Sequence, residues 1–392
     1  MKVFFLGHLN AKQQMAPVKR SICLAKGMTA AGLDVEIDVM HQVFSINDVD
    51  DLESKGYYDG IKYVFINGHQ LIESSILRFF RFRILNKWGA FFYYLKHLNK
   101  GDIVYAYSML CSEILLLKLA VVIRRAKLVL EIVEIPFYHD KLISRIRRFF
   151  TEHFAFALLD GATCISEALE DYVKEHSSKR TKITQVPILV SDIVNIQTDS
   201  EYRVPYIIHT GSMLERKDGI SYILKAFAEF RKTDNSACRL VFAGPDSNEK
   251  CSYNSMIRDL GIKDYVDLLG MITDSVRLAS LQKNAALSIV YRFDNTQTRH
   301  GFSTKMGEIL IAGTPLITTP VGGHTAYLSD GVNVKYVEPG NVGQLTEAIT
   351  LLIHNKEIAA KIGQNGRKLA QQVFNPYYQG QRIKTFFNSI QN

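Results

Sequence analysis

Two doubly wound α/β domains are the architecture that the sequence predicts, on three observations. The chain has 392 residues, a length typical of two domains. Short apolar segments alternate with helical segments in both halves of the chain. These apolar segments are nearly continuous, as in parallel strands that helices cover on both faces.

The first half carries one series of predicted strands, with helical stretches between most of them. These strands are residues 2–7, 35–40, 63–67, 103–108, 128–134, 162–166 and 183–188. A polar stretch with weak periodicity, residues 191–203, follows them. We therefore place a first domain at residues 1–195 and a second domain at residues 196–375.

The second half repeats the alternation. Its predicted strands are residues 206–211, 239–244, 266–270, 286–291, 315–319 and 335–339. A helix beginning at Asp218 carries apolar residues at helical spacing on one face, which predicts a half-buried helix. These residues are Ile220, Ile223, Leu224, Phe227 and Phe230. The last segment, residues 376–392, is expected to form a helix that returns to the first domain.

Composition limits the classes of partner. Hydrophobic residues make up 47% of the chain and charged residues 22%, which favours a large core and excludes general disorder. The formal charge of +8 favours anionic partners such as phosphates, nucleic acid or an acidic membrane surface. Because no nucleic-acid recognition motif accompanies this charge, we do not expect a nucleic-acid partner.

The cysteines and the apolar windows predict a cytoplasmic protein. The five cysteines form no CxxC pair and show no zinc spacing, so we expect reduced thiols and no metal site. The N-terminal "MKVFFLG" is too short for a signal peptide. The most apolar window, residues 114–123, has about half the length of a spanning helix and contains Lys118.

A first candidate site follows the strand at 206–211, in "HTGSMLERKDG". Gly211 ends the strand, and Arg216 and Lys217 lie beside the start of the next helix. Two cations beside a helix start suit a diphosphate. The alternative is that both are solvated loop charges.

A second candidate site is "HGFSTKMGE", residues 300–308, for which we expect a glycine-bearing loop and a helix start. Gly301 permits close approach of the backbone to a ligand, and Ser303 or Thr304 would cap a helix whose free N–H groups attract an anion. Lys305 adds a positive charge. Glu308 could accept two hydrogen bonds from the vicinal hydroxyls of a ribose, or could merely neutralise the helix N-terminus.

The order of several motifs resembles the nucleotide-sugar domain of family 4 retaining glycosyltransferases, which have the GT-B fold of two Rossmann-like domains. The motifs are "GSMLERKDG", "LVFAGP", "HGFSTKMGEILIAGTPLITTPVGG" and "VEPGNVGQLTEAI", and the resemblance covers roughly residues 205–350. It implies a nucleotide-sugar-binding second domain, an acceptor-binding first domain and a ligand cleft between them. The donor would be a UDP- or GDP-sugar.

The family has two glutamates separated by seven residues, the second of which binds the ribose. Glu308 matches the second glutamate, whereas His300 stands at the position of the first, followed by the family's Gly301 and Phe302. Lys217 matches the phosphate-binding lysine, and Ser212 replaces an arginine whose charge Arg216 would supply. His300 implies either altered donor geometry in an active enzyme or weakened catalysis.

The resemblance implies a retaining transfer without metal, in which Lys217, Arg216 and helix N–H groups neutralise the leaving diphosphate. The strand at 128–134 precedes His139, in a region where family members often contact the donor sugar. His139 is therefore a candidate site residue, or else a surface histidine. No metal or other cofactor is expected.

A basic and aromatic segment of the first domain suggests a membrane surface. Between Glu73 and Asp102 the only charged residues are the cations Arg78, Arg81, Arg83, Lys87, Lys96 and Lys100. Cations interleaved with Phe, Tyr and Trp suit an anionic bilayer, and a second basic patch lies at residues 144–150. The alternative is an ordinary amphipathic helix with its cations in water.

Three functions remain open from the sequence. The first is a glycosyltransferase that moves sugar to a glycan or lipid-linked acceptor in cell-surface polysaccharide synthesis. This protein would be cytoplasmic and peripheral at the inner face of the plasma membrane. The second is a nucleotide-sugar epimerase or hydrolase of the same fold. The third is a catalytically silent nucleotide-sugar-binding partner.

Overall fold

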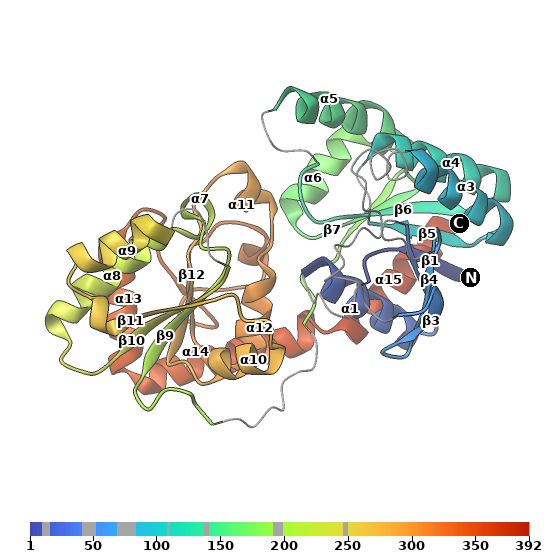
Figure 1. The fold of residues 1–392 in the computed structure, drawn as a ribbon. Helices are drawn as coiled ribbons and strands as arrows, with labels where there is room; N and C mark the ends of the chain where they lie inside the picture. The colour runs from blue at the N-terminus through green and yellow to red at the C-terminus, as the bar shows by residue number, and fades with distance from the viewer. Residues whose placement is uncertain are drawn as a thin grey trace. The chain divides into compact units, whose positions relative to one another are not determined.

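The computed structural model describes residues 1–9, 16–40, 52–68, 84–107, 110–136, 141–190, 199–245 and 250–391. It divides into two compact units, of which unit 1 comprises Met1–Leu189 with Asn375–Asn392 and unit 2 comprises Val190–Phe374. Each unit contains one twisted sheet with helices on both faces (Figure 1).

The sheet of unit 1 has eight strands in the order β3-β4-β2-β1-β5-β6-β7-β8. All neighbouring strands are parallel except β3 and β4. The strands are β1 (Lys2–Leu6), β2 (Asp34–Val39), β3 (Lys55–Tyr58), β4 (Ile61–Phe65), β5 (Ile103–Ala106), β6 (Lys127–Ile132), β7 (Gly161–Cys164) and β8 (Lys182–Gln185).

The short strand β3 departs from the predicted all-parallel sheet. It pairs antiparallel with β4 at the sheet edge, through a two-residue turn at Asp59 and Gly60. Both turn residues have positive φ, at 51° and 79°, which is the backbone that a tight hairpin requires. The sequence prediction missed β3 because its four residues alternate between exposed and half-buried and lack an apolar run.

Helices cover the two faces of this sheet in separate groups. Helices α1 (Ala16–Ala30) and α15 (Pro376–Gln391) contribute to one hydrophobic core, and α3 (Asn86–His97) and α4 (Cys111–Arg124) pack together on the other face. Helices α5 (Leu142–Phe150) and α6 (Glu167–His176) and the short helices η2 (Thr151–Ala155) and η3 (Phe156–Leu158) complete the unit.

The C-terminal helix α15 lies beside α1, although the two are far apart in the sequence (Figure 1). The helices cross at Gly27 and Gly380, whose backbones touch. A Cβ atom on Gly380 would lie 2.0 Å from the carbonyl oxygen of Gly27. Any larger residue at this crossing would push the helices apart.

Unit 2 contains a six-stranded parallel sheet in the order β11-β10-β9-β12-β13-β14. Its strands are β9 (Tyr206–Thr210), β10 (Arg239–Ala243), β11 (Val266–Gly270), β12 (Leu287–Val290), β13 (Leu316–Thr318) and β14 (Lys335–Tyr336). Each strand overlaps one that the sequence predicts, because continuous apolar runs of this length fit a sheet that is buried on both faces.

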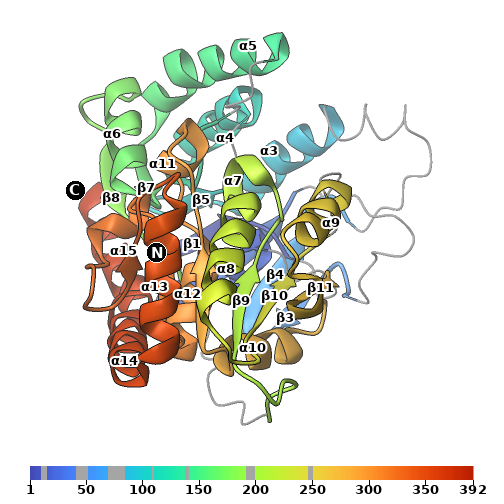
Figure 2. The ribbon, with the colours of Figure 1, turned by 90° about the vertical axis from the view of Figure 1, so that its left-hand side faces the viewer.

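The helices of unit 2 also form two layers. Helices α8 (Ile220–Thr233), α9 (Lys250–Asp259) and α13 (Val342–His354) belong to the larger core, and α10 (Ser275–Lys283) packs on the opposite sheet face with α12 (Thr304–Ala312). Helix α14 (Lys356–Val373) contacts both α12 and α13 (Figures 1 and 2). The face predicted for α8 is confirmed, since Ile220, Ile223, Leu224, Phe227 and Phe230 are all fully buried.

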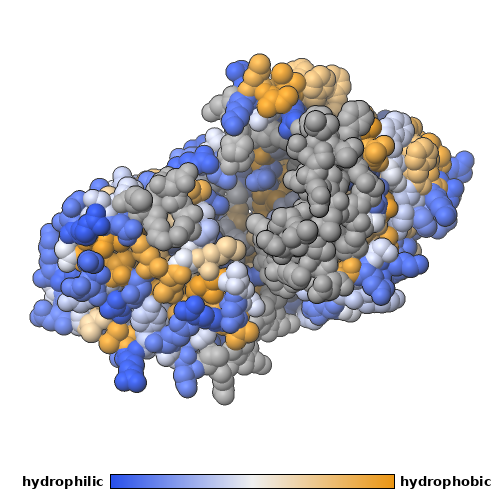
Figure 3. Space-filling model, viewed as in Figure 1, coloured by the Kyte–Doolittle hydropathy of each residue, from blue (hydrophilic) through white to orange (hydrophobic). Residues whose placement is uncertain are grey.

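Helix α5 is unusual because it buries none of its residues. At the place of α5 in Figure 1, Figure 3 shows hydrophobic side chains at the surface beside hydrophilic ones. No helix in the described part of the chain is both long and apolar enough to cross a membrane.

Candidate functional site

The candidate site lies in unit 2, where the strand order of the sheet reverses. From β9 the chain proceeds outward to β10 and β11, and from the adjacent β12 it proceeds to β13 and β14 in the other direction. Ligands of doubly wound sheets bind outside the carboxyl ends of strands at such a switch point. Here those ends are Gly211, after β9, and Arg292, after β12.

Gly211 is surrounded so closely that a side chain at this position would displace its neighbours. A Cβ atom at this position would lie 2.6 Å from Nε2 of His209 and 2.7 Å from Nζ of Lys305. The predicted cation Lys305 therefore reaches back from α12 to the end of β9. The structure thus brings the first and second predicted sites together in one cluster.

Asp218 is the buried carboxylate of this cluster. One carboxylate oxygen accepts a hydrogen bond from the Ser212 hydroxyl at 2.5 Å, and the other lies 3.9 Å from Nζ of Lys305. Burial opposes its ionisation, but Lys305, His209, Ser212 and Lys217 together outweigh burial and lower the pKa of Asp218. Asp218 is therefore ionised and holds the cations in place.

Lys305 carries the most perturbed charge of the predicted site residues. Burial of its ammonium, reinforced by the neighbouring cations Lys217 and Arg292, lowers its pKa to about 8 despite Asp218 and Glu308. A second anion near this ammonium would favour its charged form. The surroundings of Lys305 thus favour the binding of an anionic ligand beside its ammonium.

Arg216 and Lys217 lie on the single-turn helix α7 (Glu215–Asp218). Arg216 is exposed and Lys217 is half-buried. The side-chain amide of Asn295 donates a hydrogen bond of 3.1 Å to the Arg216 carbonyl and so ties α7 to the segment after β12. Because Lys217 affects the pKa values of both Asp218 and Lys305, its charge belongs to the same cluster.

His300 does not open a loop, as the sequence prediction had it, but ends the short helix α11 (Thr296–His300). The sequence prediction missed α11, which begins with a reciprocal capping box between Asn295 and Thr298. The imidazole Nδ1–H donates to the Thr296 carbonyl at 2.9 Å. In the neutral ring, Nε2 is then the atom that can accept a hydrogen bond.

Gly301 and Phe302 link α11 to α12. Gly301 has extended backbone with φ of −86°, and its carbonyl accepts a hydrogen bond from the Gly323 N–H at 2.9 Å. Phe302 is only 6% exposed and packs against Phe374 at 5.5 Å between ring centroids. Its ring therefore anchors the loop against Phe374 and offers little surface to a ligand.

Helix α12 presents the remaining predicted residues in its first two turns. Ser303 is its N-cap, but its side chain makes no capping hydrogen bond, and Thr304 is the first helical residue. Lys305 and Glu308 are one turn apart and half-buried, and the charge of Glu308 acts on Lys305. One helix N-terminus thus carries hydroxyls, a cation and a carboxylate, of which the cation reaches the end of β9.

Arg292 is a site residue that the sequence analysis missed. It is 5% exposed, and within the described ranges its guanidinium makes no hydrogen bond or ion pair. Burial lowers its pKa, which the charge of Asp218 opposes. A Cβ atom on Gly301 would lie 3.6 Å from its Nη2. The available signal was an arginine directly after the apolar strand 286–291.

Several predicted residues lie elsewhere. His139, Arg78, Arg81 and Arg83 fall outside the described residues. Lys87 was predicted as a surface cation, and this is wrong, because it is 8% exposed. Its ammonium donates to the Ser112 hydroxyl at 2.6 Å and lies 3.6 Å from the Glu113 carboxylate. Lys96 and Lys100 are exposed.

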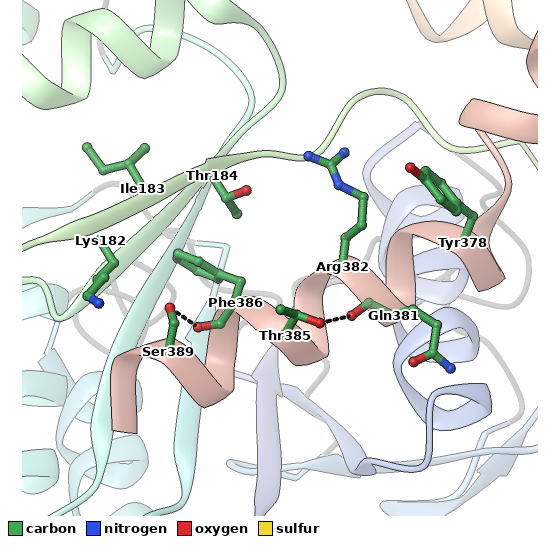
Figure 4. A pocket seen from close by; sticks show the side chains of 9 residues that line it. All are labelled: Lys182, Ile183, Thr184, Tyr378, Gln381, Arg382, Thr385, Phe386 and Ser389. Atoms are coloured by element: carbon green, nitrogen blue, oxygen red, sulfur yellow. Dashed lines mark hydrogen bonds between the residues drawn. The ribbon is translucent and has the colours of Figure 1, made fainter. Parts of the chain in front are cut away.

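A hollow of 460 Å³ lies within unit 1, between the edge strand β8 and α15. Lys182 and Thr184 line it from the strand, and Tyr378, Arg382 and Phe386 line it from the helix (Figure 4). None of the predicted site residues contributes to it. Among the described residues, no group of three or more His, Cys, Asp or Glu is arranged to hold a metal ion.

Comparison with known proteins finds similarity to one family in unit 2. Residues 197–369 match the family model described as glycosyl transferases group 1. EpsD of Bacillus subtilis (strain 168), which its name describes as a glycosyltransferase, is 30% identical over 34% of this chain and 32% of its own length. The MMP alpha-(1->4)-mannosyltransferase of Mycolicibacterium hassiacum is 29% identical over 40% of this chain and 36% of its own length.

The chain therefore spans about a third of the length of these curated relatives. Solved structures match almost the whole chain instead. Sucrose-phosphate synthase from Thermosynechococcus elongatus matches with a TM-score of 0.72 and 16% identity, over 99% of this chain and 100% of that chain. HepE of Anabaena in complex with UDP-glucose matches with a TM-score of 0.69 and 16% identity, over the same shares. These matches confirm the predicted GT-B fold.

Proposed function

We propose that this chain, which matches the group 1 glycosyl transferases over residues 197–369, is a member of that family and transfers sugar from a UDP- or GDP-sugar to a glycan or lipid-linked acceptor. The observation that carries the proposal is the excess of positive charge after β9 and β12, of which Arg292 is buried and Lys305 and Lys217 are half-buried. Lys305 and Arg292 surround a single buried carboxylate, Asp218, and Lys217 adds a third cation. Buried charge of this kind calls for an anion.

A nucleoside diphosphate matches this excess of positive charge. Its two phosphates would lie beyond the end of β9, where Lys305 reaches the backbone at Gly211. Lys305, Lys217 and Arg292 would contact the phosphate oxygens. The family often has an arginine where this chain has Ser212. Arg292 would then supply the positive charge that is missing at that position. This replaces our sequence-based assignment of that role to Arg216, which is exposed.

Glu308 would bind the nucleoside. It lies one turn beyond Lys305 on α12, so a ligand held by Lys305 at its diphosphate brings its ribose hydroxyls toward this carboxylate. The Anabaena protein HepE binds UDP-glucose on the same fold, which supports a uridine nucleotide as one candidate donor. The narrower family 4 assignment, with retention of the anomeric configuration, remains part of this proposal.

The leaving diphosphate would gain negative charge as the bond to the sugar breaks. Lys305, Arg292 and Lys217 stabilise that charge without a metal ion, because they are already oriented by Asp218 and by burial. His300 would accept a hydrogen bond from a sugar hydroxyl through Nε2, since Nδ1–H is engaged with Thr296. The acceptor attacks the anomeric carbon, and its proton passes to the departing phosphate oxygen or to water.

We also propose a cytoplasmic site of action, peripheral at the inner face of the plasma membrane. The cysteines Cys23, Cys111, Cys164 and Cys238 are all free thiols, which suits a reducing compartment. A lipid-linked acceptor in polysaccharide synthesis would explain why exposed Trp88, Lys96 and Lys100 follow the basic segment that begins at Arg78.

Nucleotide release tests this function. The full chain is incubated with UDP- and GDP-sugars, with and without glycan or lipid-linked acceptors, and the freed UDP or GDP is measured. Release that an acceptor accelerates supports transfer, whereas equal release without an acceptor supports a hydrolase. Binding without any release would support a silent partner. In that case His300→Glu, which restores the family's glutamate, should be measured beside the wild type.

A further inference from the structure

Helix α5 is amphipathic, but its apolar side is exposed to solvent and its polar side is the more buried one. At 3.6 residues per turn, its apolar residues fall on one side of the helix and Ser144, Arg148 and Thr151 on the other. The exposed apolar residues, the last from the following turn, are Leu142 (72%), Ile143 (54%), Ile146 (44%), Phe149 (50%), Phe150 (48%) and Phe154 (52%).

The polar side of α5 faces the protein. Thr151, just after the helix, is fully buried, and its hydroxyl donates to the Arg147 carbonyl at 3.0 Å. Ser144 and Arg148 are half-buried, and Arg148 lies 3.9 Å from Glu152. Burial of these polar residues, and not of the apolar ones, shows that the polar side is turned toward the protein. An ordinary surface helix does the reverse and buries its apolar stripe.

Neighbouring helices expose apolar stripes as well. On α3, Trp88 and Phe92 are exposed one turn apart. On α4, which packs against α3 and contacts η2 directly after α5, Leu115, Leu119 and Val122 are exposed at helical spacing. Exposed apolar groups that gather in this way mark interaction surfaces.

Charge identifies the partner. Across α3, α4 and α5 the only carboxylate is Glu113, which is 4% exposed and lies 3.6 Å from Lys87. The exposed charges are cations, and on α5 the exposed Arg145 and the half-buried Arg147 flank the apolar side on its two edges. A second copy of this chain, docked through the same surface, would set cations against cations.

We propose that α5 is a docking helix for an anionic lipid bilayer. Its apolar side chains would enter the boundary between headgroups and acyl chains, and Arg145 and Arg147 would contact anionic headgroups. The bilayer then completes the hydrophobic contact that the helix lacks in the protein. This inference rests on α5 and its neighbours and is independent of sugar transfer.

Flotation with vesicles tests the proposal on the full chain. Vesicles contain phosphatidylcholine alone or phosphatidylcholine with about a third phosphatidylglycerol. We expect binding to the anionic vesicles only, weakening as salt rises, because screening shortens the reach of the cations. Flotation that is absent, or equal on both vesicle types, would overturn the proposal.

Variants locate the contact on α5. Ile146→Ser with Phe149→Ser should reduce the partition coefficient about tenfold or more, because each exposed side chain would lose its transfer into the interface. Arg145→Gln with Arg147→Gln should reduce it about fivefold for each arginine. The matched control is Met271→Ser, an exposed apolar residue of unit 2, which should leave it unchanged.

Two controls keep the outcome interpretable. Each α5 variant should bind UDP or GDP as the wild type does, because the proposed nucleotide-binding residues lie in unit 2. Nucleotide binding therefore distinguishes a failure of the proposed function from a loss of membrane contact. Size-exclusion chromatography at equal concentration separates a second explanation. A wild-type dimer that the Ile146 and Phe149 substitutions dissociate, without vesicle binding, would assign the surface to self-association and refute the lipid partner.

Discussion

Nucleotide affinity should fall as the pH rises through the pKa of Lys305. The free protein holds that pKa at about 8, chiefly because the ammonium is buried. A bound diphosphate favours the charged ammonium, so binding takes up a proton once the pH exceeds 8. The interaction is therefore nearly complete at pH 7 and is lost progressively as the pH rises through 8.

The magnitude follows from the protonated fraction. With a pKa of about 8, roughly nine tenths of Lys305 is charged at pH 7 and roughly one tenth at pH 9. Affinity for UDP or GDP should thus weaken about tenfold between these values, equivalent to about 1.4 kcal/mol. The terminal phosphate, whose second pKa is near 6, is ionised throughout and does not contribute.

Isothermal titration calorimetry at pH 7, 8 and 9 measures the effect. Two buffers with different ionisation enthalpies also report proton uptake directly. Lys305→Arg is the matched control, because a guanidinium stays charged over this range and should make the affinity flat with pH. Equal wild-type affinity at pH 7 and pH 9, or the same decline in Lys305→Arg, would refute the role of Lys305.

Three further outcomes are expected. Glu308→Gln should weaken the binding of free UDP or GDP and of the nucleotide sugar alike, because the carboxylate is proposed to bind the ribose; equal affinity by calorimetry would leave Glu308 a structural role. Transfer should persist in EDTA, since side-chain cations neutralise the diphosphate, and activity that EDTA abolishes and magnesium or manganese restores would contradict this. Asp38→Asn should stabilise the protein more at pH 8 than at pH 5. Each kcal/mol added to the free energy of unfolding should raise the melting temperature by about 2–4 °C. The carboxyl of Asp38 is fully buried, and burial, with the charge of Glu36, raises its pKa well above the ordinary value. Wild-type stability from this group is therefore greatest at low pH and declines as the pH rises, and a constant difference between variant and wild type in calorimetric melts would show that Asp38 does not titrate in this way.

Apolar strands were the most predictable feature of the fold. Buried parallel strands such as β9 and β12 require continuous apolar residues, and that requirement is visible in the sequence. Strand β3 lacks such a run, and the only sequence signal for it is the Asp59-Gly60 pair, which is typical of a hairpin turn. Helix α11 has five residues, too few to show a helical period.

The candidate site was predictable only in part, because sequence motifs identify residues but do not show how deeply each one is buried. Gly211, Lys305 and Glu308 were found from glycine turns and helix starts, and the structure places Lys305 beside Gly211 and Glu308 one turn farther along the same helix. Arg292 was missed because a single arginine after a strand looks like a solvated charge until its burial is known. Lys87 was misassigned for the opposite reason, since its partner Glu113 lies on another helix.

The outward orientation of the apolar side of α5 could not be predicted either, because it depends on tertiary structure. The segment "LISRIRRFF" reveals an amphipathic helix, and the usual expectation is that its apolar side is buried. Only the exposed fractions of Ile146 and Phe149, set against the buried Thr151, show that the apolar side faces outward.

Calorimetric titration of the full chain with UDP and GDP, for the wild type and Arg292→Gln, tests the central claim most directly. We predict one site per chain for at least one nucleotide. The variant should bind about 10- to 100-fold more weakly, because a charge-assisted hydrogen bond to phosphate is lost. Its melting temperature should not fall, since the removed guanidinium is a buried charge whose pKa burial already lowers. If neither nucleotide bound, or if a folded Arg292→Gln variant bound with wild-type affinity, the cations after β9 and β12 would not form a nucleotide-sugar site.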